Sequence, residues 1–208
     1  GKNEWRAALI TVSFLFFSNF CYVHLRSGAD PLIEAFSSPH LVAGSWIALL
    51  SLFGGIGILV GPLGVLRGVL CLSVLLFYQS LSGYHFVSKS PFDFSVMAYN
   101  SESTLTLESL VIVGESIGLL SLLVSLGYLL LAIVWRPLRT ILFSATYLSR
   151  KRALFGSAAL GTYLLLTFTG AAPYDEVGQF ILSIVSHYRT SDEFHFSERY
   201  PAGTYPFV

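Results

Sequence analysis

The stretch SLVIVGESIGLLSLLVSLGYLLLAIVW (Ser109–Trp135) and the RPLRTILFSATYLSRKR that follows it (Arg136–Arg152) decide the fold that this sequence predicts. At about 1.5 Å per residue, the first part is long enough to cross a hydrocarbon layer about 30 Å thick. The second part carries five basic residues and no acidic residue. By the positive-inside rule, such a segment stays in the cytoplasm. The two parts together therefore predict one membrane span and the orientation of every other span.

The composition points to the same class of protein. The chain has 208 residues, of which 54% are hydrophobic and only 12% are charged. Basic and acidic residues are equal in number, at 12 each, so there is no basic excess to indicate a nucleic-acid partner. Cys21 and Cys71 lie in apolar stretches without the spacing of metal ligands, which argues against a disulfide or a zinc site. We expect an all-α, polytopic integral membrane protein.

Apolar stretches of spanning length predict five transmembrane helices that form one bundle over residues 1–172. The expected spans are about 5–25, 41–60, 63–83, 109–135 and 153–172. A tight turn at Gly61-Pro62 joins the second and third spans, and the segments 26–40, 84–108 and 136–152 are expected to be loops. Pairs of small residues four apart, such as Gly57/Gly61 and Ser157/Gly161, predict close helix packing.

The distribution of basic residues predicts the orientation of the bundle. With the N-terminus in the cytoplasm, five spans place the C-terminus on the exoplasmic side, which for a bacterial inner membrane is the periplasm. Eight of the twelve basic residues then fall on the cytoplasmic side: Lys2, Arg6, Arg67, Arg136, Arg139, Arg150, Lys151 and Arg152.

The segment 173–189 predicts an amphipathic helix at the exoplasmic interface. Its apolar residues recur at helical spacing: Val177, Phe180, Ile181, Ile184, Val185 and Tyr188. Asp175 and Glu176 stand in its first turn and Arg189 in its last, as the helix dipole favours. Because the polar face lacks the Lys/Arg enrichment of lipid-bound helices, we expect the stripe to dock a protein partner; the lipid interface is the alternative. Residues 190–208 are expected to form an extended exoplasmic tail or linker.

Two carboxylates of the predicted fourth span form a candidate site. Glu108 and Glu115 are seven residues apart and so lie on one face of a helix. A carboxylate inside the membrane is costly and usually has a partner or a role. Together with Asp93 and Tyr99 of the preceding aromatic loop, the pair is a candidate for binding a lipid headgroup or another polar ligand. The alternative is that Glu115 bonds a side chain of a neighbouring helix.

Neither a cofactor nor a catalytic centre is predicted. His24, His40 and His85 fall at the outer edges of the spans, where they are considered as pigment or haem ligands. Paired haem ligands of membrane proteins lie deeper in the apolar layer, so interfacial hydrogen bonding is the preferred interpretation. The sequence contains no G-x-S-x-G, no H-E-x-x-H and no P-loop, so no catalytic or metal-binding residue is assigned and the chain is not expected to be an enzyme by itself.

The loop PFDFSVMAYN (Pro91–Asn100) and the helix DEVGQFILSIVSHYR (Asp175–Arg189) carry a resemblance. With five spans and a basic inner loop, this arrangement resembles the N-terminal membrane domain of the lipoteichoic-acid-synthase-like and phosphoethanolamine-transferase-like proteins of the alkaline phosphatase superfamily. In that family a metal-binding domain with a Thr nucleophile follows the linker. No position of this chain matches the catalytic residues of that domain, so none is carried over.

These observations leave several functions open. The first is a non-catalytic anchor or scaffold of a larger membrane assembly, as the membrane domain or a degenerate relative of an envelope phospho-group transferase. The second is an accessory subunit of a respiratory or photosynthetic complex. The third is a lipid-binding protein with its site near Glu108 and Glu115. In each case the expected partners are membrane lipids and other membrane proteins.

Overall fold

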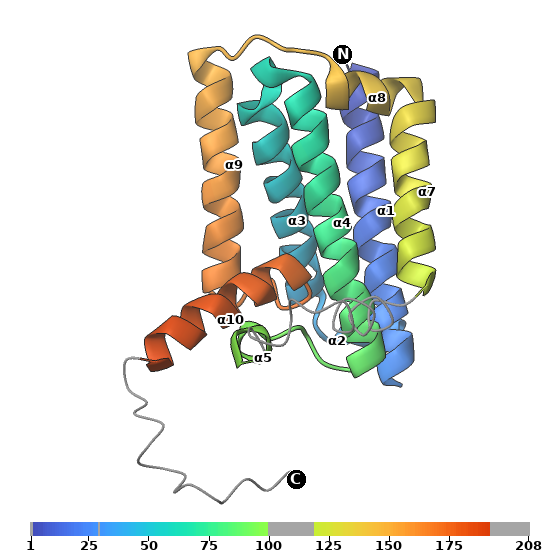
Figure 1. Cartoon of the computed structure of the whole chain (residues 1–208), viewed down its shortest axis with the longest axis vertical. Helices are drawn as coiled ribbons and strands as arrows, with labels where there is room; N and C mark the ends of the chain where they lie inside the picture. Colours follow the sequence, from blue (N-terminus) through green and yellow to red (C-terminus); the bar gives the residue numbers. More distant parts are fainter. Residues whose placement is uncertain (1, 29, 100–118, 192–208) are drawn as a thin grey trace, which may run out of the picture.

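The computed structural model describes residues 2–28, 30–99 and 119–191, and over these ranges the chain is helical and contains no strand (Figure 1). The prediction of an all-α fold is therefore confirmed at the level of secondary structure. In chain order the elements are α1 (Lys2–Ser27), α2 (Pro31–Ser37), α3 (Pro39–Leu59), the 3-10 turn η1 (Gly61–Leu63), α4 (Val65–Ser88), α5 (Phe94–Tyr99), α7 (Leu119–Val134), α8 (Arg136–Phe143), α9 (Arg150–Phe168) and α10 (Glu176–Ser191).

Three helices, α1, α3 and α4, are long and apolar enough to cross a membrane. Helices α7 and α8 meet the same requirement only as a pair, and they are bent by 88° at the break between them. Helix α9 stands beside α3 (Figure 1), but its first turn carries Arg150, Lys151 and Arg152, which shortens its apolar stretch. Over the described residues, the structure thus supports a membrane protein with three spans, or up to four if the bent pair counts as one. Five spans are not confirmed, and the first part of the predicted span 109–135 lies outside the described residues.

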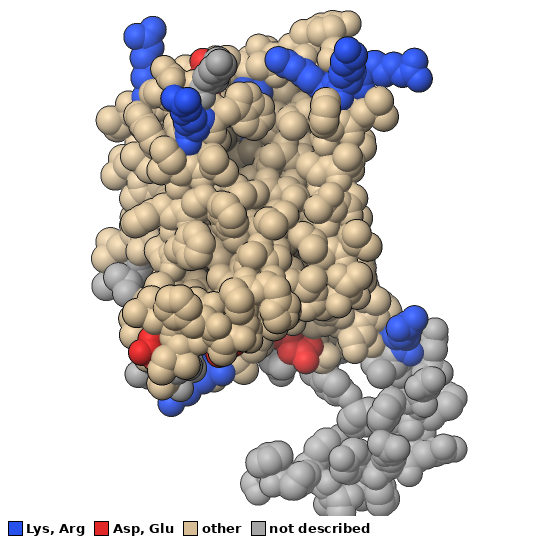
Figure 2. All heavy atoms as spheres, turned by 180° about the vertical axis from the view of Figure 1, so that it is seen from behind, with Lys and Arg blue, Asp and Glu red and all other residues tan. Residues whose placement is uncertain are grey.

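The surface of the bundle is apolar, whereas several of its buried positions are polar. Large side chains such as Phe14 on α1, Leu130 on α7 and Leu165 on α9 are at least half exposed. Polar side chains such as Asn19 and Gln79 are buried. Figure 2 shows a broad band of uncharged atoms between the two charged ends of the molecule. In water this arrangement would be unfavourable, and in a hydrocarbon layer it is expected.

Helices α3 and α9 pack closely because glycine occurs where they meet. A Cβ atom at Gly55 would lie 2.6 Å from the Leu160 side chain, and one at Gly44 would lie 2.0 Å from the carbonyl oxygen of Ala171, just after α9 ends. Gly156 on α9 is equally tight against Leu59. Small residues allow backbones this close in membrane helices. The predicted pair Ser157/Gly161 plays no part in this contact, since both residues are exposed.

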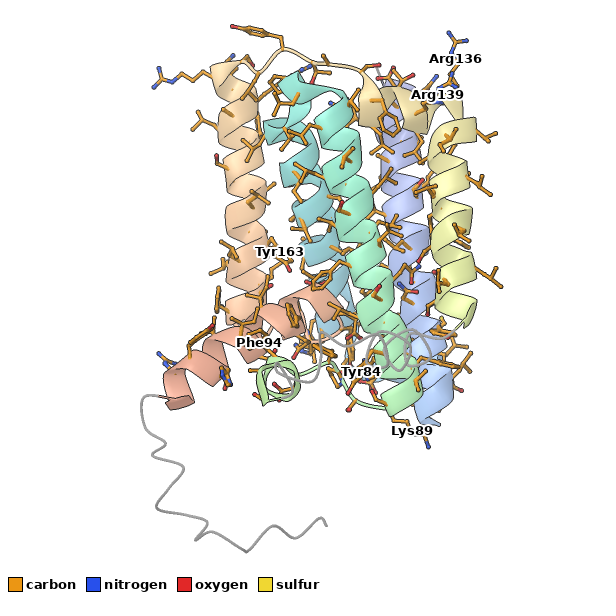
Figure 3. The ribbon with its side chains drawn as sticks, viewed as in Figure 1. Tyr84, Lys89, Phe94, Arg136, Arg139 and Tyr163 are labelled. Atoms are coloured by element: carbon orange, nitrogen blue, oxygen red, sulfur yellow. The ribbon has the colours of Figure 1, made fainter. Side chains whose placement is uncertain are left out.

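The predicted loop 136–152 contains helix α8, which lies across one end of the bundle (Figure 1). Pro137 stands in its first turn, where a missing N–H costs nothing. Leu138 is buried under α8, whereas Arg136 and Arg139 are exposed and extend away from the bundle (Figure 3). The segments 26–40 and 84–108, also expected to be loops, contain the short helices α2 and α5.

Arg67, at the start of α4, fastens the chain that follows α8. Its side chain is 2% exposed. Nε donates to the Leu142 carbonyl oxygen at 3.1 Å, Nη1 donates to Thr146 Oγ1 at 3.3 Å, and Nη2 donates to the Ser144 carbonyl oxygen. These bonds satisfy carbonyl groups at the C-terminal end of α8 that the helix itself leaves open.

Charge is segregated between the two ends of the bundle. Figure 2 shows most of the Lys and Arg atoms at the upper end, and most of the Asp and Glu atoms at the lower end. The upper end, which holds α8 and the first turn of α9, is called the basic end below. The lower end, which holds α2, α5 and α10 (Figure 1), is called the acidic end.

Candidate functional site

Helix α10 lies across the acidic end of the bundle, and its first turn is buried there (Figure 1). Asp175, directly before the helix, is 0% exposed. Its Oδ2 accepts a hydrogen bond from the Gly178 N–H at 3.1 Å, which is the bond of an N-terminal cap. Glycine leaves room for these side chains at position 178, since a Cβ atom there would lie 2.8 Å from Asp175 Oδ2 and 3.0 Å from Thr167 Oγ1.

Glu176, the first residue of α10, pairs with a histidine of the bundle. Its Oε1 lies 2.6 Å from Nδ1 of His85 on α4. The side chains are 8% and 20% exposed, respectively, so the pair is largely shielded from solvent. A short contact between a carboxylate and an imidazole is typical of a charge-assisted hydrogen bond. The pair ties the start of α10 to the last turns of α4.

Tyr174 connects the same corner to two further helices. Its N–H donates to Ser45 Oγ on α3 at 3.0 Å, and its hydroxyl donates to Glu34 on α2. The ring packs edge-on against Phe20, with 5.2 Å between centroids, and lies beside His24. Burial, followed by the hydrogen bond to Glu34, raises the pKa of Tyr174 to about 12. The hydroxyl therefore stays protonated and remains a donor at physiological pH.

The middle of α10 is held by an aromatic cluster. The Phe180 ring lies 5.3 Å from Phe77 on α4, 5.8 Å from Phe92 and 6.1 Å from Phe94 on α5, measured between centroids. The Phe94 N–H also donates to Ser183 Oγ at 3.0 Å. Phe94 points toward α10 (Figure 3). Helix α5 and the loop before it thus bind α10 from below.

Burial dominates the ionisation of Asp175. It raises the pKa of this carboxyl from 3.8 to about 7. The neighbouring Tyr163 hydroxyl and the Gly178 N–H favour the charged form and lower the pKa, but by less than burial raises it. Tyr163 comes from α9 and points toward the start of α10 (Figure 3). A carboxyl group with this pKa changes its charge within the physiological range.

The polar groups around Asp175 and Glu176 are incompletely paired. In the described part of the chain, seven of these buried polar atoms have no hydrogen-bond partner: Asn19 Nδ2, Gln79 Nε2, Ser82 Oγ, Tyr163 Oη, Thr167 Oγ1, Asp175 Oδ1 and Glu176 Oε2. A small cavity of about 30 Å³ is lined by Asn19, Ser82 and Glu176, among others. It is large enough for about one water molecule, which such unpaired groups can bind.

We call the residues that hold α10 from the bundle the α10 socket: Glu34, Ser45, Tyr78, His85, Tyr163 and Thr167. The helix dipole explains why Asp175 and Glu176 stand at the start of α10. In the structure, both acids are also buried in this socket. Sequence reasoning missed this role, because the burial depends on residues contributed by four other helices. Two features of the sequence could have indicated the socket. Two acids directly follow an apolar helix, and the polar residues Asn19 and Gln79 lie inside predicted spans.

The predicted carboxylate site falls largely outside the described residues. Glu108 and Glu115 both lie in the range 100–118, and the side chain of Tyr99 is likewise not described. Asp93 is exposed, and its Oδ1 accepts a hydrogen bond from the Ser95 N–H at 2.8 Å, so it caps α5. It also lines a shallow groove of about 390 Å³ between α5 and α10.

The three histidines considered as cofactor ligands do not converge on one point. His85 bonds Glu176, and His24 Nδ1 lies 2.8 Å from the carbonyl oxygen of Phe20 in its own helix. Both line the small cavity of the socket, whereas His40 is exposed at the start of α3. Over the described ranges, no group of three or more His, Cys, Asp or Glu residues is placed to hold a metal ion.

The apolar stripe of α10 divides into two parts. Val177 is buried, and Phe180 and Ile181 pack against the core of the bundle. Val185 and Tyr188, further along the helix, are 42% and 63% exposed. Ile184 lies between these two parts and is partly exposed. The first half of the stripe therefore docks on this chain itself, and only the second half is available to a partner.

The arrangement can hold a helix at a fixed angle on the end of a membrane bundle and can bind a proton there. Comparison of the chain with protein-family models, with curated proteins and with solved structures finds no match.

Proposed function

We propose that this chain is a non-catalytic anchor or scaffold module of a bacterial inner membrane. The basic end faces the cytoplasm and the acidic end faces the exoplasmic side. The segregation of charge between the two ends supports this orientation, because basic residues are retained on the cytoplasmic side. In this orientation α10 lies at the outer surface of the membrane.

The observation that carries the proposal is the attachment of α10. A surface helix that served only to float in the lipid interface would expose its polar face and bury its apolar face in lipid. Here the start of α10 is held on the bundle by the His85–Glu176 pair and by the hydrogen bond from the Tyr174 N–H to Ser45 Oγ. Helix α10 is consequently held at a defined place and angle on the end of the bundle, as an anchor requires.

The partner we propose is a catalytic domain of an envelope phospho-group transferase, carried by the same polypeptide or by another. This assignment rests on the resemblance described above and on the exposed second half of the α10 stripe. The accessory subunit of a multi-subunit complex is the alternative, and it uses the same exposed surface.

Photo-crosslinking from this surface tests the proposal. A photoreactive amino acid in place of Tyr188 is expected to form a protein adduct in native membranes, whereas one in place of Phe155 on α9 is expected to react with lipid alone. Phe155 is a suitable control because it is 70% exposed on the apolar side of the bundle. Mass spectrometry of the Tyr188 adduct identifies the partner. Lipid adducts alone at both positions would contradict the anchor role.

A further inference from the structure

An apolar cavity at the basic end is not used by the α10 socket. It has a volume of about 260 Å³ and lies among α1, α3, α4, α7 and α8. Its walls include Trp5 and Leu15 on α1, and Gly54 and Gly57 on α3. On the face shown in Figure 2, the surface is hollowed near the upper, basic end. The volume far exceeds that of one water molecule, and apolar cavities of this size stay dry and accept apolar ligands.

The depth of the cavity matches one leaflet of a membrane. Along α1 its lining runs from Trp5 to Leu15, and along α4 it runs from Arg67 to Leu75. At about 1.5 Å per residue, these stretches extend about 12–15 Å from the basic end. Half of a hydrocarbon layer about 30 Å thick is about 15 Å. The cavity therefore covers the depth of one acyl chain and ends near the middle of the bundle.

The charges at the shallow end of the cavity are mostly positive, although Glu4 in the first turn of α1 lies at the same end. Arg67 forms part of its wall, and among the described residues no carboxylate pairs with this guanidinium. Leu138 and Leu142 of α8 also line it, and the same short helix carries Arg136 and Arg139 at the basic end (Figure 3). Trp5 adds an aromatic side chain of the kind that lies at headgroup level. A phosphate at this level would meet several cations.

We propose that this cavity binds one anionic phospholipid of the leaflet at the basic end, with an acyl chain between α1, α3 and α4 and its phosphate beside the cations of α8. The acyl chain fits the apolar lining and its depth. The negative headgroup fits the excess of positive charge at this end of the bundle, as for other basic pockets between membrane helices. This site is independent of the proposed anchor role, because it lies at the opposite end of the bundle from α10.

The double substitution Gly54→Leu, Gly57→Leu tests the site by filling it. A Cβ atom at either glycine has no atom within 4 Å, so the added side chains enter the open space. The control is Gly161→Leu on α9, which also has nothing within 4 Å of its Cβ and lies away from the cavity. Each full-length protein is placed in nanodiscs of phosphatidylcholine and phosphatidylserine, and retained lipid is counted by native mass spectrometry.

We expect the unmodified protein and the control to retain one phosphatidylserine, and the filled variant to retain at least tenfold less. Equal retention by the filled variant would overturn the proposal, as would equal retention of phosphatidylcholine. A second measurement does not depend on a variant. Phosphatidylserine with a diazirine in one acyl chain should label peptides around Leu50–Gly57 and Leu72–Leu75. Labelling spread evenly over the exposed faces, including Leu165, would also overturn it.

Discussion

Replacing Arg67 with methionine is expected to lower the free energy of unfolding by about 3–5 kcal/mol, since a buried cation and its hydrogen bonds are lost. Methionine fills a similar volume but donates no hydrogen bond. The carbonyl oxygens of Leu142 and Ser144 and the hydroxyl of Thr146 then lose their common donor. The loop between α8 and α9 loses its attachment to α4 at the same time.

The measurement is the unfolding free energy in lipid bilayers, obtained by steric trapping, for Arg67→Met beside Arg139→Met. Arg139 is exposed on α8 and provides the matched loss of one positive charge. Exposed substitutions of this kind change stability by about 0.5 kcal/mol or less. Equal stabilities of the two variants would show that Arg67 does not hold the basic end together.

The substitution Asp175→Asn is expected to remove a pH dependence from the docking of α10. Burial raises the pKa of Asp175 from 3.8 to about 7, so the docked helix holds a proton that an undocked, solvated Asp175 loses. Docking is therefore unaffected by Asp175 below about pH 4, weakens as the pH rises from about 4 to about 7, and stays constant above that. The total effect is about 4 kcal/mol.

Asparagine retains an oxygen that can accept the Gly178 N–H, and it cannot ionise. Its amide can also donate to Thr167 Oγ1, which lacks a partner within the described part of the chain. Other charged or titratable groups face this site, namely Glu176 on α10, His85 and Tyr78 on α4, and Tyr163 on α9. They remain in both proteins, so a comparison at equal pH isolates the contribution of Asp175.

The measurement is hydrogen exchange of the backbone amides of residues 178–190, compared between the unmodified protein and the Asp175→Asn variant. At pH 8 the asparagine variant should exchange more slowly than the unmodified protein, by up to about a thousandfold. At pH 4.5 the two should differ little. Equal protection of the two proteins at pH 8 would contradict the prediction that the charged form of Asp175 destabilises the docked helix.

Much of the fold could be predicted from the sequence because hydropathy and helical periodicity are local properties. The apolar run 5–25 falls within α1, the runs 41–60 and 63–83 coincide with α3 and α4 to within two residues at their shared turn, and the segment 173–189 overlaps α10. The bend after Val134 and the helical form of Arg136–Phe143 were missed, since Arg136-Pro137 fits a loop and the start of a helix equally well.

The α10 socket could not be predicted in the same way. Asp175 and Glu176 are acids at a helix start, where exposure is the ordinary expectation. Their burial results from contacts with Tyr163 and His85, which are 12 and 91 residues away in the sequence. The helical spacing of its apolar residues identified the stripe of α10. The spacing does not show which half of the stripe packs against the bundle of the same chain.

Cysteine accessibility tests the central claim most directly, namely that the basic end lies in the cytoplasm and the α10 end outside. Cys21 and Cys71 are first replaced by alanine, and single cysteines are then placed at Tyr147, which is 83% exposed between α8 and α9, or at Lys89, which is exposed after α4. In spheroplasts, a membrane-impermeant maleimide should label Lys89→Cys, and it should label Tyr147→Cys only after the membrane is permeabilised. Labelling of Tyr147→Cys in intact spheroplasts, with Lys89→Cys protected, would contradict the orientation and the outer position of α10.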